Sequence, residues 1–133
     1  MADNSLNQIQ LTLYDEMDEI KAQLSELNET KSWIVNGPAI DLIRRTKQIA
    51  ILQGRRLTVD KVQNQLQSAT DLTTFQKWLK EVTRENQAQY EHLEQNLKQA
   101  DPTSDHYLQL LTDYYQAYGR QHVFNQLNAH SLL

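Results

Sequence analysis

Residues 49–82 read IAILQGRRLTVDKVQNQLQSATDLTTFQKWLKEV, and the breaks within this stretch decide the fold that the sequence predicts. Gly54 is expected to end a helix that starts near Pro38, because glycine is the usual residue just past a helix C-terminus. Thr58 can cap a second helix, and the polar run 67–70 forms a turn before a third. Three short helices joined by short loops are the usual body of a helix-turn-helix domain. The sequence therefore predicts an all-α fold with a trihelical module, with or without a wing.

The third helix of this module is expected to start at a cap formed by Thr70 or Asp71 and to end near Arg84. Its apolar residues recur at three- and four-residue spacing, which is typical of a helix with one face in a core. These residues are Leu72, Phe75, Leu79 and Val82.

Charge is segregated along the chain. Residues 38–84, the predicted module, hold nine of the 13 Lys and Arg but four of the 17 Asp and Glu, a local balance of +5. The N-terminal region, residues 1–37, balances to −5, and the C-terminal helical region, residues 85–133, balances to −4. A basic block between acidic flanks is typical of a polyanion-binding module that the overall acidic pI conceals.

The same stretch, 49–82, resembles the N-terminal DNA-binding domain of the KfrA family, plasmid-encoded regulators with an α-helical coiled-coil tail. In that family a helix ends in a Gly-Arg-Arg turn and is followed by a Thr-Val-Asp-x-Val helix, a Ser/Thr-rich turn and a helix that starts with Thr-Thr. The resemblance implies binding of double-stranded DNA in plasmid maintenance or transcriptional regulation. The matching positions are Gly54-Arg55-Arg56, Thr58-Val59-Asp60, Val62, Thr73-Thr74 and Leu79-Lys80-Glu81.

The chain departs from the family pattern in two places. A helix of about thirty residues precedes the module, and about fifty residues rich in Tyr and Gln replace the long coiled coil. The resemblance therefore implies DNA contact more directly than it implies self-association through the tail.

The exposed face of the predicted third helix carries hydroxyls, an amide and long cations, which suit contacts to phosphates and base edges in a major groove. Arg55 and Arg56, on the turn before the second helix, are placed to contact backbone phosphates. The alternative is that these cations only solvate a helical surface. The candidate DNA-binding residues are Arg55, Arg56, Thr58, Lys61, Thr73, Thr74, Gln76, Lys77, Lys80 and Arg84.

Residues 5–30 are expected to form one long helix, because an apolar stripe of coiled-coil type repeats along them every seven residues. Gln10 interrupts the stripe at one position. The stripe either packs on the chain's own core or joins two chains into a homodimer, and the sequence favours neither. The candidate dimerisation residues are Leu6, Leu13, Met17, Ile20, Leu24 and Leu27.

Residues 85–133 are expected to form two helices separated near Asp101-Pro102, the second starting at Thr103 or Ser104 and broken at Gly119. A tyrosine stripe marks the second helix. It predicts either a core or oligomer seam or, as the alternative, a surface that stacks nucleobases. Its members are Tyr107, Tyr114, Tyr115 and Tyr118.

Several classes of function are not expected. The sequence has no cysteine for a disulfide or a thiolate metal site, and its four histidines lack metal-binding spacing. It has no phosphate-binding glycine loop or acid–base motif, so we expect no enzymatic activity, cofactor or metal. No apolar run approaches the ~18 residues of a membrane span, and no signal peptide is recognisable, so a cytoplasmic location is expected. The alternative to DNA binding is an all-helical adaptor or inhibitor with no nucleic-acid role.

Overall fold

The computed structural model describes residues 2–28 and 38–131, and these residues form four helices. They are α1 (Ala2–Asn28), α3 (Ala39–Ser68), α4 (Leu72–Gln99) and α5 (Asp105–Ser131). The predicted all-α class is confirmed, and the described residues contain no strand. Within that described part of the chain, no helix combines the length and apolarity that crossing a membrane requires.

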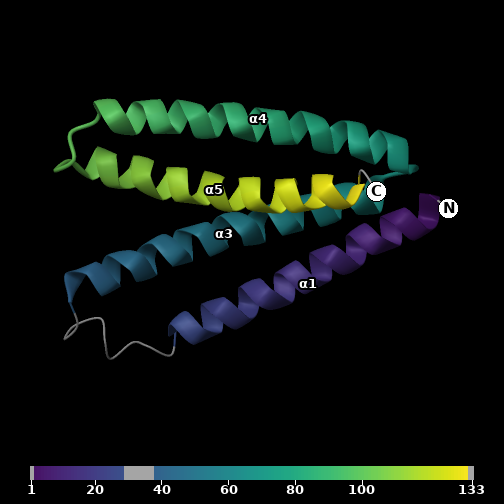
Figure 1. Cartoon of the computed structure of the whole chain (residues 1–133), viewed down its shortest axis with the longest axis horizontal. Helices are drawn as coiled ribbons and strands as arrows, with labels where there is room; N and C mark the ends of the chain where they lie inside the picture. The colour runs from purple at the N-terminus through teal and green to yellow at the C-terminus, as the bar shows by residue number, and fades with distance from the viewer. Residues whose placement is uncertain (1, 29–37, 132–133) are drawn as a thin grey trace.

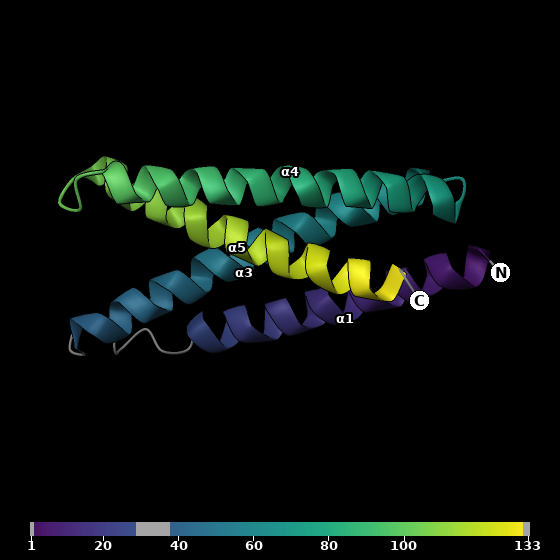
Figure 2. The same ribbon diagram turned by 45° about the horizontal axis from the view of Figure 1, so that its top comes forward.

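The helices form two antiparallel pairs that cross each other (Figure 1). In one pair α1 packs on α3, and in the other α4 packs on α5. The two pairs are joined mainly through α3 and α5, which make the most extensive contact among the described helices. α3 and α5 run in the same direction and cross near their middles, so that their N-terminal ends diverge (Figure 2).

Gly54 and Gly119 lie at this crossing, in the interiors of α3 and α5. A Cβ atom on Gly54 would lie 2.8 Å from the Cα of Gln116, and one on Gly119 would lie 3.0 Å from the carbonyl carbon of Ile51. The two backbones therefore approach more closely than any larger residue allows. The predictions that Gly54 and Gly119 end helices are wrong, because each glycine serves a contact between helices and not a chain reversal.

The boundaries inside the predicted module change accordingly. α3 continues unbroken through Thr58, which caps no helix, and α4 continues well past Arg84. Residues 38–84 form one long helix and the first half of the next, in place of three short helices. The described helices thus bear out the all-α class but not the expected helix boundaries of the module.

The two turns that bound α4 are set by local hydrogen bonds and lie where the sequence predicts them. Asp71 Oδ1 accepts a hydrogen bond of 2.7 Å from the backbone N–H of Thr74, so Asp71 is the N-cap of α4. This bond also lowers the pKa of the Asp71 carboxyl. At the other end, Asp101 Oδ1 accepts from the backbone N–H of Thr103 at 3.0 Å. α5 then starts one residue after Ser104.

The apolar stripe of α1 lies in the core of its own chain. Leu13 and Ile20 are fully buried, and the other four stripe residues are partly buried against the same cluster. Of the two alternatives that the sequence leaves open, the structure has the stripe pack within the chain. A homodimer joined by this stripe would require α1 to leave the core. The other buried residues of this cluster are Ile9, Leu52, Val59, Val62, Leu66, Phe75, Leu79, Val82, Val123, Phe124 and Leu127.

Candidate functional site

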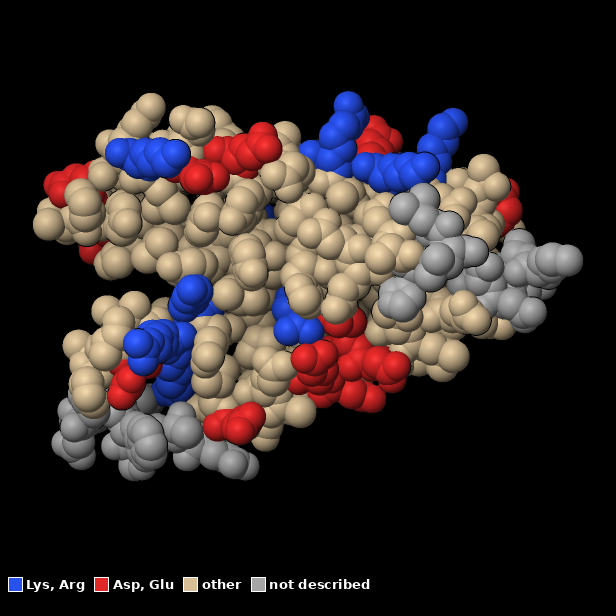
Figure 3. All heavy atoms as spheres, viewed as in Figure 1, with Lys and Arg blue, Asp and Glu red and all other residues tan. Residues whose placement is uncertain are grey.

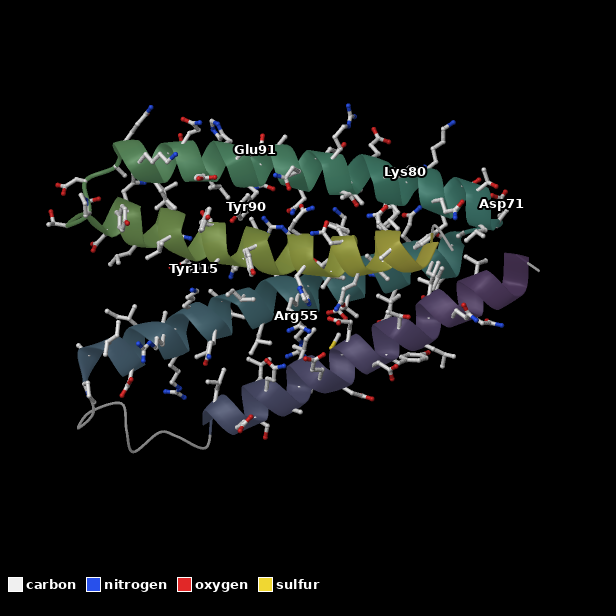
Figure 4. All side chains as sticks on the ribbon, viewed as in Figure 1. Arg55, Asp71, Lys80, Tyr90, Glu91 and Tyr115 are labelled. Atoms are coloured by element: carbon white, nitrogen blue, oxygen red, sulfur yellow. The ribbon has the colours of Figure 1, made fainter. Side chains whose placement is uncertain are left out.

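Arg55 is buried between α3 and α1 (Figure 4). Its Nη2 lies 2.8 Å from Oε2 of Glu16 and 3.5 Å from Oε2 of Glu19. The side chains of Arg55 and Glu16 are 9% and 7% exposed, so this ion pair is desolvated. Removing one partner of such a pair costs several kcal/mol, of the order of 3–5. The expected phosphate contact of Arg55 is therefore incompatible with this structure.

Thr58 is a second candidate DNA-binding residue that the fold buries. Its hydroxyl donates a hydrogen bond of 2.8 Å to the carbonyl oxygen of Gly54, one turn earlier in α3. The hydroxyl faces the inside of the molecule and not a nucleic acid. The sequence pattern that suggested a cap therefore belongs to a helix interior.

The other eight candidates are divided between two helices. Arg56 and Lys61 are exposed on α3, and Lys61 lines a small groove together with Glu85 and Arg120. The six candidates on the first half of α4 are Thr73, Thr74, Gln76, Lys77, Lys80 and Arg84, and all but the half-buried Gln76 are exposed.

Four of these six share one face of α4. Thr73, Lys77, Lys80 and Arg84 follow each other at four-, three- and four-residue intervals, which places them in a line along a helix. We call this line the α4 basic stripe. Lys and Arg gather along the outer edge of α4 in Figure 3, with acidic atoms beside them. In the described part of the chain, none of the three cations forms an ion pair.

An open cleft lies where the N-terminal halves of α3 and α5 diverge, and we call it the α3–α5 cleft. At its inner end the Lys47 ammonium lies 5.4 Å from the ring centroid of Tyr115, a cation–π contact. Ile40 and Ile43 precede Lys47 by seven and four residues, and Leu108 precedes Tyr115 by seven. Helical periodicity therefore places these apolar side chains on the two walls that face each other. Figure 3 shows the hollow between the α4–α5 pair and the α1–α3 pair.

The walls of the cleft are apolar and open to solvent. Ile40, Ile43 and Leu108 are 52%, 60% and 57% exposed. Single exposed apolar residues are ordinary on a protein surface, but large ones that gather around a concave region mark interaction sites. The α3–α5 cleft has this character.

The helix crossing closes the inner end of the cleft and fixes its opening. Gln116 Nε2 donates a hydrogen bond of 3.2 Å to Gln53 Oε1, directly beside the contact of Gly54 with the backbone of α5. Figure 4 shows Tyr115 on the side of α5 that faces α3. The angle between the two walls is thus set by the contacts at the helix crossing.

Two members of the tyrosine stripe, Tyr114 and Tyr118, lie at the seam between α4 and α5, whereas Tyr115 faces α3. The hydroxyls of Tyr90 and Tyr114 are 2.7 Å apart, and their rings stack with centroids 4.8 Å apart. Burial raises the pKa of Tyr90 well above the usual value for a phenol, and the hydrogen bond to Tyr114 raises it further. Tyr118 lies beside them, with its ring centroid 6.4 Å from that of Tyr90. Of the two interpretations of the stripe, these contacts support a seam within the chain for Tyr114 and Tyr118.

A second hollow of about 630 Å³ lies between α1 and α3, lined by Gln23, Leu27, Gln48, Ile51 and Arg55 among others. The Nε of Arg55 is buried without a hydrogen-bond partner. The lining mixes two amides, one carboxylate, the Arg55 guanidinium and aliphatic groups, and it points to no particular ligand. Within the described residues no cluster of His, Asp and Glu is arranged to hold a metal ion.

Sequence reasoning missed the α3–α5 cleft. Ile40 and Ile43 have the spacing of ordinary core positions, and only the divergence of α3 from α5 leaves them exposed. One signal was present, because Ala50 and Gly54 are small residues four apart, as at a close helix contact. Comparison of the chain with protein-family models, with curated proteins and with solved structures finds no match.

Proposed function

We propose that this chain is an all-helical protein-interaction module that binds an amphipathic helix in the α3–α5 cleft. The exposure of Ile40, Ile43 and Leu108 on two facing walls carries the proposal. Each of these side chains is about half exposed, so covering it would contribute about 1 kcal/mol. Three such contributions in one concave site favour a bound apolar partner over open solvent.

The shape of the cleft supports a helical ligand. Helices pack with their axes about 8–10 Å apart, and a third helix between two diverging ones completes a small bundle. Recognition of this kind uses apolar residues at i, i+3 or i+4, and i+7 of the ligand. The ligand we expect therefore carries such a stripe, with its apolar residues against Ile40 and Ile43 on one side and Leu108 on the other.

Selection of helical peptides from a displayed library tests this proposal. Peptides enriched on the intact protein should share the apolar stripe, and Ile43→Asp or Leu108→Asp should abolish their binding. Leu11→Asp is the matched control, because Leu11 is 62% exposed on α1, outside the cleft. Circular dichroism should show the same helix content for all three variants.

Two results would contradict the proposal. One is a selection that enriches no peptide above background. The other is a set of enriched peptides whose binding falls with Leu11→Asp and is unchanged by both cleft variants.

A second candidate function is the binding of double-stranded DNA through the α4 basic stripe, in plasmid maintenance or transcriptional regulation. The KfrA resemblance suggests it, and three exposed cations in one line, which form no ion pair with any described residue, favour it. Glu81 directly follows Lys80 and Glu85 directly follows Arg84, which limits the number of phosphates that the stripe can contact. With three phosphate contacts, the logarithm of the binding constant should fall with the logarithm of salt concentration at a slope of about −3.

Fluorescence anisotropy of labelled duplex DNA across a salt series tests this candidate. The variant Lys77→Ala/Lys80→Ala should bind more weakly and reduce the slope by about 2. Lys98→Ala, on the same helix but beside Glu94, is the control that should change neither. Absence of binding at ~50 mM salt, where such contacts are strongest, would exclude DNA binding by this stripe.

A further inference from the structure

We infer that the helix bound in the α3–α5 cleft is supplied by a second copy of this chain, an inference that rests on the proposed function. Its basis is a difference in charge between the two walls. Each wall is apolar where it faces the cleft, but one wall is flanked by cations and the other by carboxylates. A cleft with one basic wall and one acidic wall is complementary in charge to the same cleft on a second copy.

The α3 wall is the basic one. Residues 39–53 carry three Lys and Arg against one Asp. Arg45 is already engaged, because its Nη2 donates to the carbonyl oxygen of Leu27 at 2.6 Å. Arg44 is 71% exposed and has only a 3.7 Å contact with an aspartate three residues earlier. Together with Lys47 at the inner end, Arg44 leaves the rim of this wall positive.

The α5 wall is the acidic one. Residues 105–119 contain Asp105 and Asp113 and neither Lys nor Arg. Asp105 is exposed in the first turn of α5, at the outer end of the cleft. Asp113 is already engaged, because its Oδ1 accepts a hydrogen bond of 3.0 Å from Gln109 Nε2. A second molecule that approaches this wall therefore meets Asp105 at its outer end and Leu108 inside it.

Two copies related by a twofold axis along the cleft can place opposite charges together at both walls. The basic α3 wall of each copy then lies beside the acidic α5 wall of the other copy. The two basic and two acidic walls alternate around a shared apolar centre. Such an isologous contact uses one patch twice and closes on itself. A stable interface buries about 800 Å² of accessible surface on each partner, so both walls of each copy must be buried in it.

Sedimentation velocity of the full chain, from low micromolar to hundreds of micromolar, tests this inference. We expect a concentration-dependent monomer–dimer equilibrium. Arg44→Glu and Asp105→Arg should each weaken it at least about tenfold, because each places like charges together twice in the twofold dimer. Mixing the two variants in equal amounts should restore dimerisation, because the heterodimer pairs opposite charges at both contacts.

The mixing experiment separates this arrangement from a general effect of charge on solubility or folding. A wild-type chain that stays monomeric throughout the range overturns the inference. So does a dimer that is unaffected by either charge reversal, or one that the mixture fails to restore. If the chain is monomeric but still binds selected helical peptides through Ile43 and Leu108, the second copy is wrong as the partner and the interaction module stands.

Discussion

The contact between Gly54 and the backbone of Gln116 decides whether Gly54→Ala raises or lowers the free energy of unfolding. In an ordinary helix interior, alanine is more favourable than glycine by about 1 kcal/mol. Gly54 lies within α3 and has no positive φ, so its own backbone does not oppose the replacement. An added Cβ would, however, lie 2.8 Å from both the Cα and the carbonyl carbon of Gln116. These are backbone atoms of another helix and cannot turn aside as a side chain can.

The magnitude follows from these opposing effects. Forcing an extra methyl group into a packed contact costs about 1–3 kcal/mol, and the upper end applies where backbone must move. Subtracting the gain in helix propensity leaves a net loss of about 1–2 kcal/mol, which lowers the melting temperature by roughly 4–7 °C for a chain of this size. Gly119→Ala should act in the same direction, with the backbone N of Arg55 3.1 Å from its Cβ. The double variant should cost less than the sum, because one displacement relieves both clashes.

Urea denaturation followed by far-UV circular dichroism measures this loss. Asn64→Ala is the matched control, because Asn64 is exposed on the same helix and its replacement tests propensity alone. We expect that control to be neutral or slightly stabilising. An increase of about 1 kcal/mol for Gly54→Ala, as in an isolated helix, would refute the close crossing of α3 and α5.

Substitutions at three further sites test the buried polar groups and the N-cap of α4. Arg55→Ala should lower the free energy of unfolding by about 3–5 kcal/mol in urea denaturation, because Glu16 keeps a buried charge without its partner. The double variant Arg55→Met/Glu16→Leu, which removes both charges, should recover most of this loss. Asp71→Ala should lower the melting temperature at neutral pH. The pKa of Asp71 is lower in the folded state than its ordinary value of 3.8. The stability that its charge contributes is therefore fully present above pH 3.8 and is lost as the pH falls through the folded-state pKa. The difference in melting temperature between wild type and variant should narrow in acid. Asn86→Ala should cost about 1–3 kcal/mol in thermal or urea unfolding, since buried Asn86 bonds the carbonyl of Ala117 at 3.3 Å and the Arg120 Nε at 2.8 Å.

Features set by neighbouring residues were predictable from the sequence. The cap at Asp71 and the turn near Asp101-Pro102 depend on side chains that bond backbone groups two or three residues away. The apolar stripe of α1 identified a buried face, because a seven-residue repeat reports which side of a helix is apolar. The stripe does not report what covers that side, and here the cover is the chain's own core.

Features set by distant residues were not predictable in this way. A glycine at this position can end a helix or allow two helices to touch. In this chain Gly54 does the second, because the backbone of Gln116, far along the sequence, packs against it. The position of Arg55 in the sequence is compatible with a phosphate contact and with an ion pair to Glu16. Only the packing of α1 on α3 shows that Arg55 forms the ion pair. The α3–α5 cleft depends on the angle at which two helices cross, which leaves no mark on the periodicity of either one.

The most direct test of the α3–α5 cleft as a binding site is a methyl NMR titration of the isotope-labelled chain with a selected helical peptide. The methyl signals of Ile40, Ile43 and Leu108 should shift together as the peptide is added. The signals of Ile20, buried in the core, and of Leu11, exposed on α1, should stay in place. Shifts confined to Leu11, or no shift at Ile40, Ile43 and Leu108 while the peptide binds, would contradict the proposed site.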